Sequence, residues 1–314
     1  MRTRRTLLCL LASVALGAVG CGKGESTAEP VATGGANTGG TAGTAGSGGV
    51  GGSPVVKDRC PEGLTGPALV RLPAADGSFY CMDERETTVA EYTTFMKEAK
   101  ADTKTQPKEC EWNDSFVPDT YDPQLDPPSG CSMASWDILK DNPKFAMGCV
   151  DFCDAFAYCK WAGKRLCGKV GGDGTKLLMI DYPTTGSSIA TTVSGEWYGA
   201  CSQGGTSKYA YGDTRDPNKC IETEVYKAQG NASLDVTKVT SECHGTREPY
   251  SSIRDMQGSA AEWGNVCTTH NCLISGTSYT DTTPKGCEEH GLFTRTGETP
   301  DLGIRCCADA VAAQ

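Results

Sequence analysis

Histidine, aromatic side chains and positive charge are all scarce in this sequence. Three histidines, His244, His270 and His290, stand among 314 residues, so a metal centre built from several imidazoles is largely excluded. The formal net charge of −10 would repel a phosphate backbone, which excludes nucleic acids as partners. The Gly-x-Ser-x-Gly, His-Glu-x-x-His and phosphate-loop motifs are also missing, so no common hydrolase or nucleotide-binding class is indicated.

Cysteine, in contrast, is abundant, and the N-terminal segment suggests why. Eighteen cysteines in a chain of this size are typical of an exported protein in an oxidising compartment. A basic start followed by a mostly apolar run, too short for a transmembrane helix, predicts a signal peptide over residues 1–20. Ala18-Val19-Gly20-Cys21 resembles a bacterial lipobox, in which Cys21 would carry the lipid. The alternative is cleavage nearby with Cys21 unmodified.

Residues 21–58 are rich in glycine, threonine, alanine and serine and contain no aromatic side chain. Such a segment does not bury enough apolar surface to offset its ordering entropy, so we expect a disordered tether. A lipid anchor would attach the protein to a membrane, and Gly22 after the lipidated cysteine favours the outer membrane or cell surface of a bacterium. Beyond Cys9 and Cys21, sixteen cysteines remain, an even number that fits up to eight disulfides.

Residues 59–314 have the mixed composition of one folded domain. The residue pattern predicts a short strand at 78–82, a helix that begins with a capping box at 88–91, and further helices at 151–162 and 194–201. Glycine, proline, aspartate and asparagine interrupt the rest every few residues. The expected fold is therefore irregular, loop-rich and α+β, with disulfides that hold its long loops in place.

A series of segments in this domain resembles the sulfatase-modifying-factor, or formylglycine-generating-enzyme, superfamily. The segments follow one another at residues 81–92, 154–166, 196–201, 209–212, 255–263, 276–279 and 303–306. The segment DMQGSAAEW at 255–263, for example, is similar to the superfamily's GNVWEW motif. The resemblance covers about residues 60–309 and implies an irregular α+β fold related to C-type lectin domains, in which Arg165 and Trp263 are structural residues.

The resemblance also locates where oxidase chemistry would lie. In the generating enzymes, two cysteines spaced Cys-x4-Cys bind copper(I) shortly after a Gly-Gly-Ser-Trp/Tyr motif, and a substrate cysteine becomes formylglycine. Cys287 falls close to the first of these positions, but Leu292 stands at the second. One thiolate does not complete a two-sulfur site, so copper is not expected and Cys287 is a weak catalytic candidate. Other members bind iron through three histidines, which the scattered histidines here do not reproduce.

The remaining cysteines leave alternatives open. Cys267 and Cys272 have the Cys-x4-Cys spacing but precede the Gly-Gly-Ser-like motif instead of following it. We expect a local disulfide between them, the alternative being a copper pair displaced into this loop. The adjacent Cys306 and Cys307 are expected to bridge to two different partners, one of which is Cys287.

A structural calcium site is a further implication of the resemblance. In the superfamily, the stretch Asp-x-x-Gly-x-x-x-Glu ligates calcium through two side chains and two backbone carbonyls. Carried over, the ligands are Asp255, Gly258, Ala260 and Glu262. Such hard oxygen ligands suit calcium, whose coordination shell tolerates irregular loops. The alternative is that the two carboxylates make ordinary hydrogen bonds to the backbone.

The expected function is that of an exported lipoprotein whose domain has lost the oxidase chemistry. It would bind a peptide or a glycan, or serve a structural role at the cell envelope. The alternative is a copper-dependent formylglycine-generating oxidase that acts on a sulfatase cysteine. A third possibility is an activity on a secreted small molecule at a site with no recognisable motif. The number of free thiols in the native protein separates the first two.

Overall fold

The computed structural model describes residues 58–98, 102–118, 131, 133–180, 195–228, 234–238, 241–283 and 285–312. Chain contacts separate a unit Met1–Ser53 from a unit Pro54–Gln314, and the described residues all belong to the second. The predicted signal peptide, Cys21 and nearly all of the tether lie outside the described residues. Within the described ranges, no helix has the length and apolar character needed to cross a membrane.

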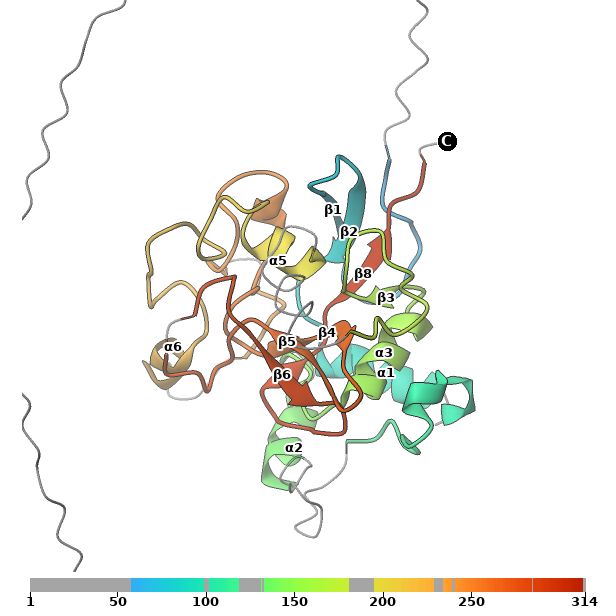
Figure 1. The fold of residues 1–314 in the computed structure, drawn as a ribbon. Helices are drawn as coiled ribbons and strands as arrows, with labels where there is room; N and C mark the ends of the chain where they lie inside the picture. The colour runs from blue at the N-terminus through green and yellow to red at the C-terminus, as the bar shows by residue number, and fades with distance from the viewer. Residues whose placement is uncertain are drawn as a thin grey trace, which may run out of the picture. The chain divides into compact units, whose positions relative to one another are not determined.

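The first of two four-stranded sheets brings together distant parts of the chain. Its order is β1 (Leu69–Pro73), β2 (Phe79–Asp83), β8 (Cys306–Asp309) and β3 (Arg165–Leu166), and all neighbours are antiparallel. Figure 1 shows the C-terminal strand β8 beside β2 and β3. The expected strand at 78–82 is β2, displaced by one residue.

The second sheet has the order β6-β5-β4-β7. Its strands are β4 (Ala261–Cys267), β5 (Asn271–Ser275), β6 (His290–Thr294) and β7 (Leu302–Gly303). Every residue of β4 is buried, because β4 lies in the interior of the sheet and packs against α3. The β4–β7 pair is parallel, and the loop before β7 therefore ends beside the start of β4.

Five described α-helices and three 3₁₀-helices complete the domain. The α-helices are α1 (Val89–Glu98), α2 (Met133–Lys140), α3 (Phe152–Trp161), α5 (Glu196–Cys201) and α6 (Thr223–Ala228). The 3₁₀-helices are η1 (Thr103–Thr105), η2 (Lys108–Cys110) and η3 (Tyr250–Ser252). Much of the domain is loop, so the prediction of an irregular, loop-rich α+β fold is confirmed.

Local hydrogen bonds explain where α1 and α3 begin. The Thr88 amide donates to Glu91 Oε2 at 2.8 Å and the Glu91 amide donates to Thr88 Oγ1 at 3.3 Å, as the capping box predicted. Asp151 caps α3 by accepting from the Asp154 amide at 2.8 Å. Beyond the end of α3, Gly163 has a φ of 76°, a conformation that favours glycine.

The sixteen cysteines of the domain form eight disulfides. The pairs are Cys60–Cys81, Cys110–Cys153, Cys131–Cys149, Cys159–Cys306, Cys167–Cys307, Cys201–Cys287, Cys220–Cys243 and Cys267–Cys272. Six of these bridges span 5 to 86 residues. The other two join α3 and the residue after β3 to the C-terminal strand, across 147 and 140 residues respectively. Cross-links of this length restrict the unfolded chain and stabilise a fold with little regular structure.

One cysteine expectation is wrong. Cys306 and Cys307 do bridge to different partners, but neither partner is Cys287. Successive residues of a strand point to opposite faces, so Cys306 reaches Cys159 on α3 while Cys307 reaches Cys167 after β3. Cys287 bonds instead to Cys201, the last residue of α5, so the loop before β6 lies beside this helix and not beside β8.

Trp263 lies at the centre of the larger buried cluster. Its side chain is 1% exposed, its indole N–H donates to the Val150 carbonyl at 3.0 Å, and its ring meets the edge of Phe152. Arg165 is also largely buried and pairs with Glu196 and Asp309. Both residues therefore have the structural roles that the resemblance implied.

Candidate functional site

A cavity of about 320 Å³ opens beside the second sheet, between β5, β6 and the loop that leads to β7. Its polar lining includes Ser278, Thr280, Asp281 and Asp301, and its apolar lining includes Ile274 and Phe293. Residues of the segment 276–279 line the cavity, and this segment resembles the motif that precedes the copper ligands of the generating enzymes. We call it the β5–β6 pocket.

Gly276 lets the chain leave β5 in the direction of this pocket. Its φ is 85°, and a Cβ at this position would lie 3.0 Å from the Met256 carbonyl oxygen and 3.1 Å from the Trp197 ring. The next residues are held by side chains: Thr277 Oγ1 donates to Glu222 at 3.0 Å, and the Ser278 amide donates to Asp281 Oδ2 at 2.8 Å. The backbone of residues 276–278, which forms part of the pocket wall, is therefore held in place by packing at Gly276 and by hydrogen bonds at Thr277 and Ser278.

Carboxylates and hydroxyls form one edge of the pocket. Ser278 Oγ lies 2.9 Å from Asp301 Oδ2 and 3.1 Å from Asp281 Oδ2, and Thr280 Oγ1 also donates to Asp301. Lys285 Nζ pairs with Asp281 Oδ1 at 2.7 Å. Burial and the Asp301 charge raise the pKa of Tyr279, so its hydroxyl stays protonated.

The cysteines that sequence reasoning considered for copper are all disulfide-bonded. Cys287 pairs with Cys201 (S–S 2.04 Å), and Leu292 lies in β6. Cys267 pairs with Cys272 across the turn between β4 and β5, at S–S 2.09 Å. A disulfide sulfur has no thiolate to offer copper(I), so the described structure contains no thiol pair beside the pocket.

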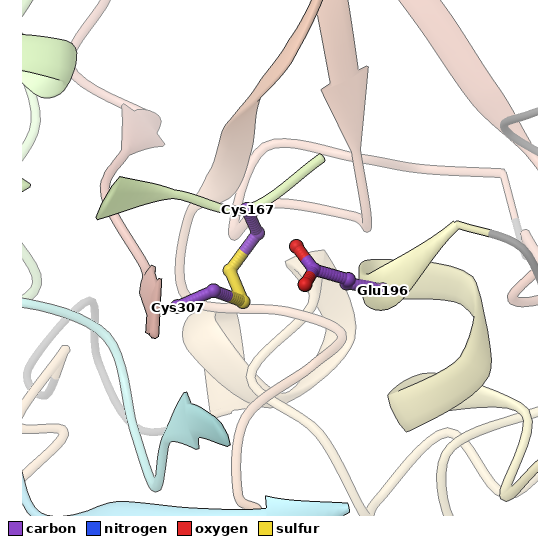
Figure 2. Close-up of side chains that lie close together, drawn as sticks. All are labelled: Cys167, Glu196 and Cys307. Carbon is purple, nitrogen blue, oxygen red and sulfur yellow. A yellow bond between two sulfur atoms is a disulfide. The ribbon is translucent and has the colours of Figure 1, made fainter. Parts of the chain in front are cut away.

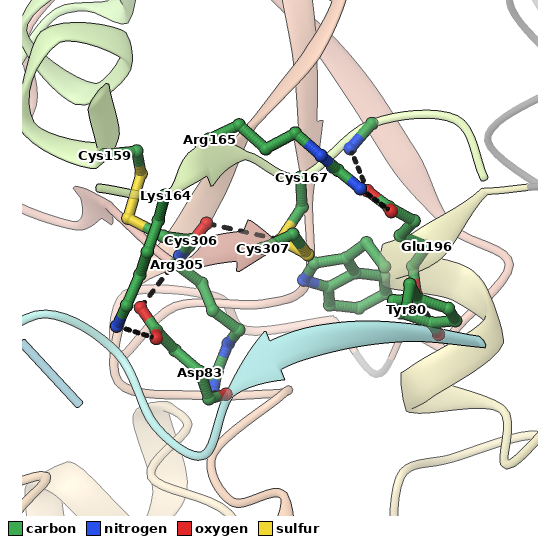
Figure 3. The surroundings of a disulfide bond; sticks show 12 residues. Tyr80, Asp83, Cys159, Lys164, Arg165, Cys167, Glu196, Arg305, Cys306 and Cys307 are labelled. Carbon is green, nitrogen blue, oxygen red and sulfur yellow. Dashed lines mark hydrogen bonds and ion pairs between the residues drawn. A yellow bond between two sulfur atoms is a disulfide. The ribbon is translucent and has the colours of Figure 1, made fainter. Parts of the chain in front are cut away.

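A third cysteine pair lies close to a carboxylate without forming a metal site. Sulfur atoms of Cys167 and Cys307 and a carboxylate oxygen of Glu196 lie within 4.8 Å of one another, and Figure 2 shows the bond between the two sulfurs. The Glu196 carboxylate accepts from Arg165 Nη1 at 2.7 Å (Figure 3). It also accepts from the Gly168 amide at 2.8 Å. The sulfurs and the carboxylate are thus occupied, and the cluster holds β3, α5 and β8 together.

The residues expected to bind calcium lie in a buried loop before β4. Asp255 and Ser259 have positive φ values of 56° and 58°, which are rare for residues with a side chain. Asp255 Oδ1 accepts from Ser241 at 2.6 Å, while Asp255 Oδ2 and Ser259 Oγ are buried without a hydrogen-bond partner. Buried oxygens without partners fit a hard cation, because such a cation would supply the missing interaction.

Glu262 has a different environment. Its Oε1 accepts from Arg305 Nε at 2.8 Å and its Oε2 accepts from Trp197 Nε1 at 2.7 Å, so both oxygens already have partners. Glu86, which sequence reasoning missed, also reaches this loop: its Oε1 accepts from the Ala260 amide at 2.8 Å, and its Oε2 is buried without a partner. Burial and then the Glu262 charge raise the pKa of Glu86 well above its usual range.

Three buried carboxylates therefore share this region with the buried guanidinium groups of Arg305 and Arg254, and Arg254 also pairs with Glu84 at 3.2 Å. Burial is the first cause of a raised pKa at both Asp255 and Glu262, although the Arg305 charge opposes it. A divalent cation would offset the excess negative charge. Two sets of three cysteine or carboxylate ligands converge within 4.8 Å in the described part of the chain, and neither contains Asp255 or Glu262. A calcium ion here would thus depend on the Gly258 and Ala260 carbonyls.

The second converging set consists of Asp151, Asp154 and Glu298, all buried at the start of α3. Asp151 and Asp154 form the capping box of the helix, and Asn113 Nδ2 donates to Asp154 Oδ1 at 2.9 Å. Glu298 comes from the loop before β7. Sequence reasoning found the cap at Asp151 but not the third carboxylate, which lies 147 residues further along the chain.

Comparison with known proteins shows to which family this chain belongs. A profile described as "Sulfatase-modifying factor enzyme 1-like domain" matches residues 73–310, so the chain belongs to this family. No curated protein matches the sequence.

Solved structures with a similar fold include PvdO from Pseudomonas aeruginosa, at 11% identity and a TM-score of 0.43, with 78% of this chain and 93% of that chain covered. CarF is 14% identical with a TM-score of 0.44 and coverages of 78% and 99%. Treponema denticola variable protein 1 is 13% identical with a TM-score of 0.39 and coverages of 82% and 100%.

Proposed function

We propose that this protein is a ligand-binding member of its family that has lost copper oxidase chemistry. The observation that carries the proposal is the disulfide between Cys287 and Cys201, together with Leu292 at the position expected for a second thiol. Copper(I) is held by thiolates, and both sulfurs of a disulfide are consumed by the bond between them. What remains beside the segment 276–279 is a pocket lined by hydroxyls, carboxylates and apolar side chains.

Such a lining suits a peptide or a glycan. Fixed carboxylates and hydroxyls select hydrogen-bond donors, and an apolar wall covers the carbon skeleton of the ligand. The loop that carries Ser278 is anchored at both ends, by Gly276 against Trp197 and by the Lys285–Asp281 ion pair. A pocket of this kind is preformed, which reduces the entropy lost when a ligand binds.

Thiol counting tests the proposal. The full-length protein is denatured without reductant, alkylated and examined by mass spectrometry, and we expect no alkylated cysteine in residues 59–314. The same preparation is incubated with copper(I) and a peptide that contains a sulfatase-type cysteine. Two free thiols, bound copper and conversion of the peptide cysteine to an aldehyde would contradict the proposal and establish the copper-dependent oxidase instead, with Cys267 and Cys272 as the first pair to examine.

A structural calcium ion is part of the proposal. The side chains of Asp255 and Glu262 and the carbonyls of Gly258 and Ala260 would hold it, and the ion would supply charge compensation. This loop also adjoins the pocket: the Tyr279 amide donates to the Ser259 carbonyl at 3.1 Å, and the Gly258 amide donates to Thr277 Oγ1 at 2.8 Å. Loss of the ion would therefore loosen the wall of the pocket as well as the loop.

Calcium binding is tested by thermal unfolding with calcium and after chelation. We expect calcium to raise the unfolding temperature of the native protein and to have no effect on Asp255→Asn. The matched control is Asp137→Asn, which removes an exposed carboxylate on α2 that pairs with Lys140. An unfolding temperature that is insensitive to calcium in the native protein would contradict the calcium site but not the ligand-binding function.

We also propose that the protein is attached to the bacterial outer membrane or cell surface through a lipid on Cys21. The lipobox-like sequence and the tether composition support this location. Mass spectrometry of the mature N-terminus is expected to find diacylglycerol on Cys21, and Cys21→Ala is expected to move the protein from the membrane fraction to the soluble one. A mature N-terminus at another, unlipidated residue would refute the anchor.

A further inference from the structure

Hydroxyl and carboxylate oxygens make up the polar edge of the β5–β6 pocket. Ser278 Oγ contacts Asp281 Oδ2, Asp301 Oδ2 and Thr280 Oγ1, and Thr280 Oγ1 contacts Asp301 Oδ2 as well. These four contacts share the hydrogens of only two hydroxyls, and each hydrogen serves one acceptor well. At least two of the contacts are therefore unsupported by a hydroxyl hydrogen. The Ser278 and Thr280 amides donate to Asp281 Oδ2 and Ser278 Oγ, but no N–H group among the described residues donates to the Asp301 carboxylate.

The two carboxylates differ in how their charge is balanced. Asp281 pairs with Lys285 at 2.7 Å. No lysine, arginine or histidine nitrogen among the described residues lies within 4.0 Å of a carboxylate oxygen of Asp301, which is only partly exposed. Burial lowers the pKa of His290 on the pocket wall, so its imidazole is neutral at pH 7. Asp301 thus faces the pocket as a negative charge without a cationic partner.

The opposite wall is apolar. Ile274 of β5 and Phe293 of β6 line the pocket and are each partly exposed. An alkyl chain is able to cover these side chains while a polar end group reaches across to the carboxylate edge. Lysine and arginine side chains combine these two features, because their methylene stems pack on apolar surface while the charged end remains hydrogen-bonded.

We infer that the β5–β6 pocket binds the cationic end of an arginine or lysine side chain of a peptide ligand at Asp301, with the stem against Ile274 and Phe293. The inference rests on the proposed ligand-binding function and specifies its ligand class. N–H donors from the ligand supply hydrogens to the Asp301 carboxylate, and the positive charge balances its negative charge. A divalent metal ion has no alkyl stem to cover Ile274 and Phe293, so it leaves the apolar wall of the pocket uncovered.

The test compares two peptides that differ in one charge. Acetyl-Gly-Arg-Gly-amide and acetyl-Gly-citrulline-Gly-amide have nearly the same shape, but citrulline is neutral. Binding to the full-length protein in detergent micelles is measured by saturation-transfer NMR titration. We expect the arginine peptide to bind about tenfold more tightly than the citrulline peptide, as for a hydrogen bond to a charged group.

Variants connect that preference to Asp301. Asp301→Asn keeps the size of the side chain and is expected to remove the preference for arginine, so that the two peptides bind with similar affinity. Asp137→Asn makes the same change in net charge on the exposed face of α2 and is expected to leave both affinities as in the native protein. Far-ultraviolet circular dichroism and the unfolding temperature show whether each variant is folded.

Three results would overturn the inference: equal affinity for both peptides, an equal effect of Asp301→Asn and Asp137→Asn, or terbium luminescence that Asp301→Asn abolishes, which would indicate a metal ion at these oxygens. Failure of the proposed function has a different signature, namely free thiols and aldehyde formation on a peptide cysteine. Because that signature does not depend on the arginine–citrulline comparison, the two outcomes are distinguishable.

Discussion

The buried carboxylates at the start of α3 lead to the sharpest prediction of stability. Asp151, Asp154 and Glu298 each offer an oxygen within 4.8 Å of the others, and their exposed fractions are 4%, 1% and 6%. The Tyr92 hydroxyl also lies near them, and burial and the Asp154 charge raise its pKa. A helix N-terminus favours negative charge, and the capping box already provides it through two carboxylates. The third carboxylate adds repulsion, so Glu298→Gln should stabilise the fold.

The size of the effect follows from the separation. Two unit charges 4.8 Å apart repel by about 3.5 kcal/mol at an effective dielectric constant of about 20. A proton held by the cluster removes part of this repulsion in the native protein. We therefore expect Glu298→Gln to increase the free energy of unfolding at pH 7.5 by about 1–3 kcal/mol. Glutamine retains an acceptor oxygen and nearly the same volume, so packing should change little.

The pH dependence has a definite sign. Burial, then the Asp154 charge, holds the pKa of Asp151 well above its usual range, and the Glu298 charge adds to the shift. The stability that this protonated carboxyl contributes is fully present below the unfolded pKa of about 3.9 and is lost as the pH rises through the folded pKa. Glu298→Gln should therefore differ little from the native protein at pH 4 and exceed it at pH 7.5.

Guanidinium unfolding with intact disulfides, followed by tryptophan fluorescence at pH 4 to 8, measures the difference. Glu111→Gln is the control, because Glu111 is exposed and its loss changes the net charge equally. The reasoning is refuted if Glu298→Gln lowers the free energy of unfolding at pH 7.5, or if its effect does not change with pH.

Three further predictions concern single features. Gly276→Ala should lower the free energy of unfolding, measured by chemical denaturation, by about 2–4 kcal/mol, because the alanine would have a left-handed φ and its Cβ would crowd buried atoms. Gly77→Ala is the control: its φ is the same but the space around it is open, so the loss should be only about 1–2 kcal/mol. Replacing both Cys201 and Cys287 by alanine opens a loop of 86 residues and should cost about 4 kcal/mol; an unchanged unfolding midpoint would mean that the bond is not formed. Arg305→Met leaves a buried carboxylate and three carbonyls without their donor, so we expect a loss of about 3–5 kcal/mol, and a loss below 1 kcal/mol would show that the guanidinium is not paired.

Several features depend on residues close together in the chain, and these were accessible to sequence reasoning. The capping box of Thr88 and Glu91 closes within three residues, and Gly163 ends α3 through its own backbone conformation. Cys267 and Cys272 are five residues apart and meet across one turn. The absence of a second thiol is read directly from the sequence, because residue 292 is leucine and not cysteine. Each of these is decided by neighbouring backbone and side-chain geometry, which the local sequence carries.

The tertiary structure alone decided which distant residues meet. Cys287 bonds to Cys201 and not to a cysteine of β8, because the loop before β6 returns to α5. Glu298 meets the cap of α3, and Asp301 meets Ser278, only because the parallel pairing of β7 with β4 brings the loop before β7 to that edge of the sheet. Contacts across 23 to 147 residues depend on the path of the whole chain, and no local pattern encodes that path.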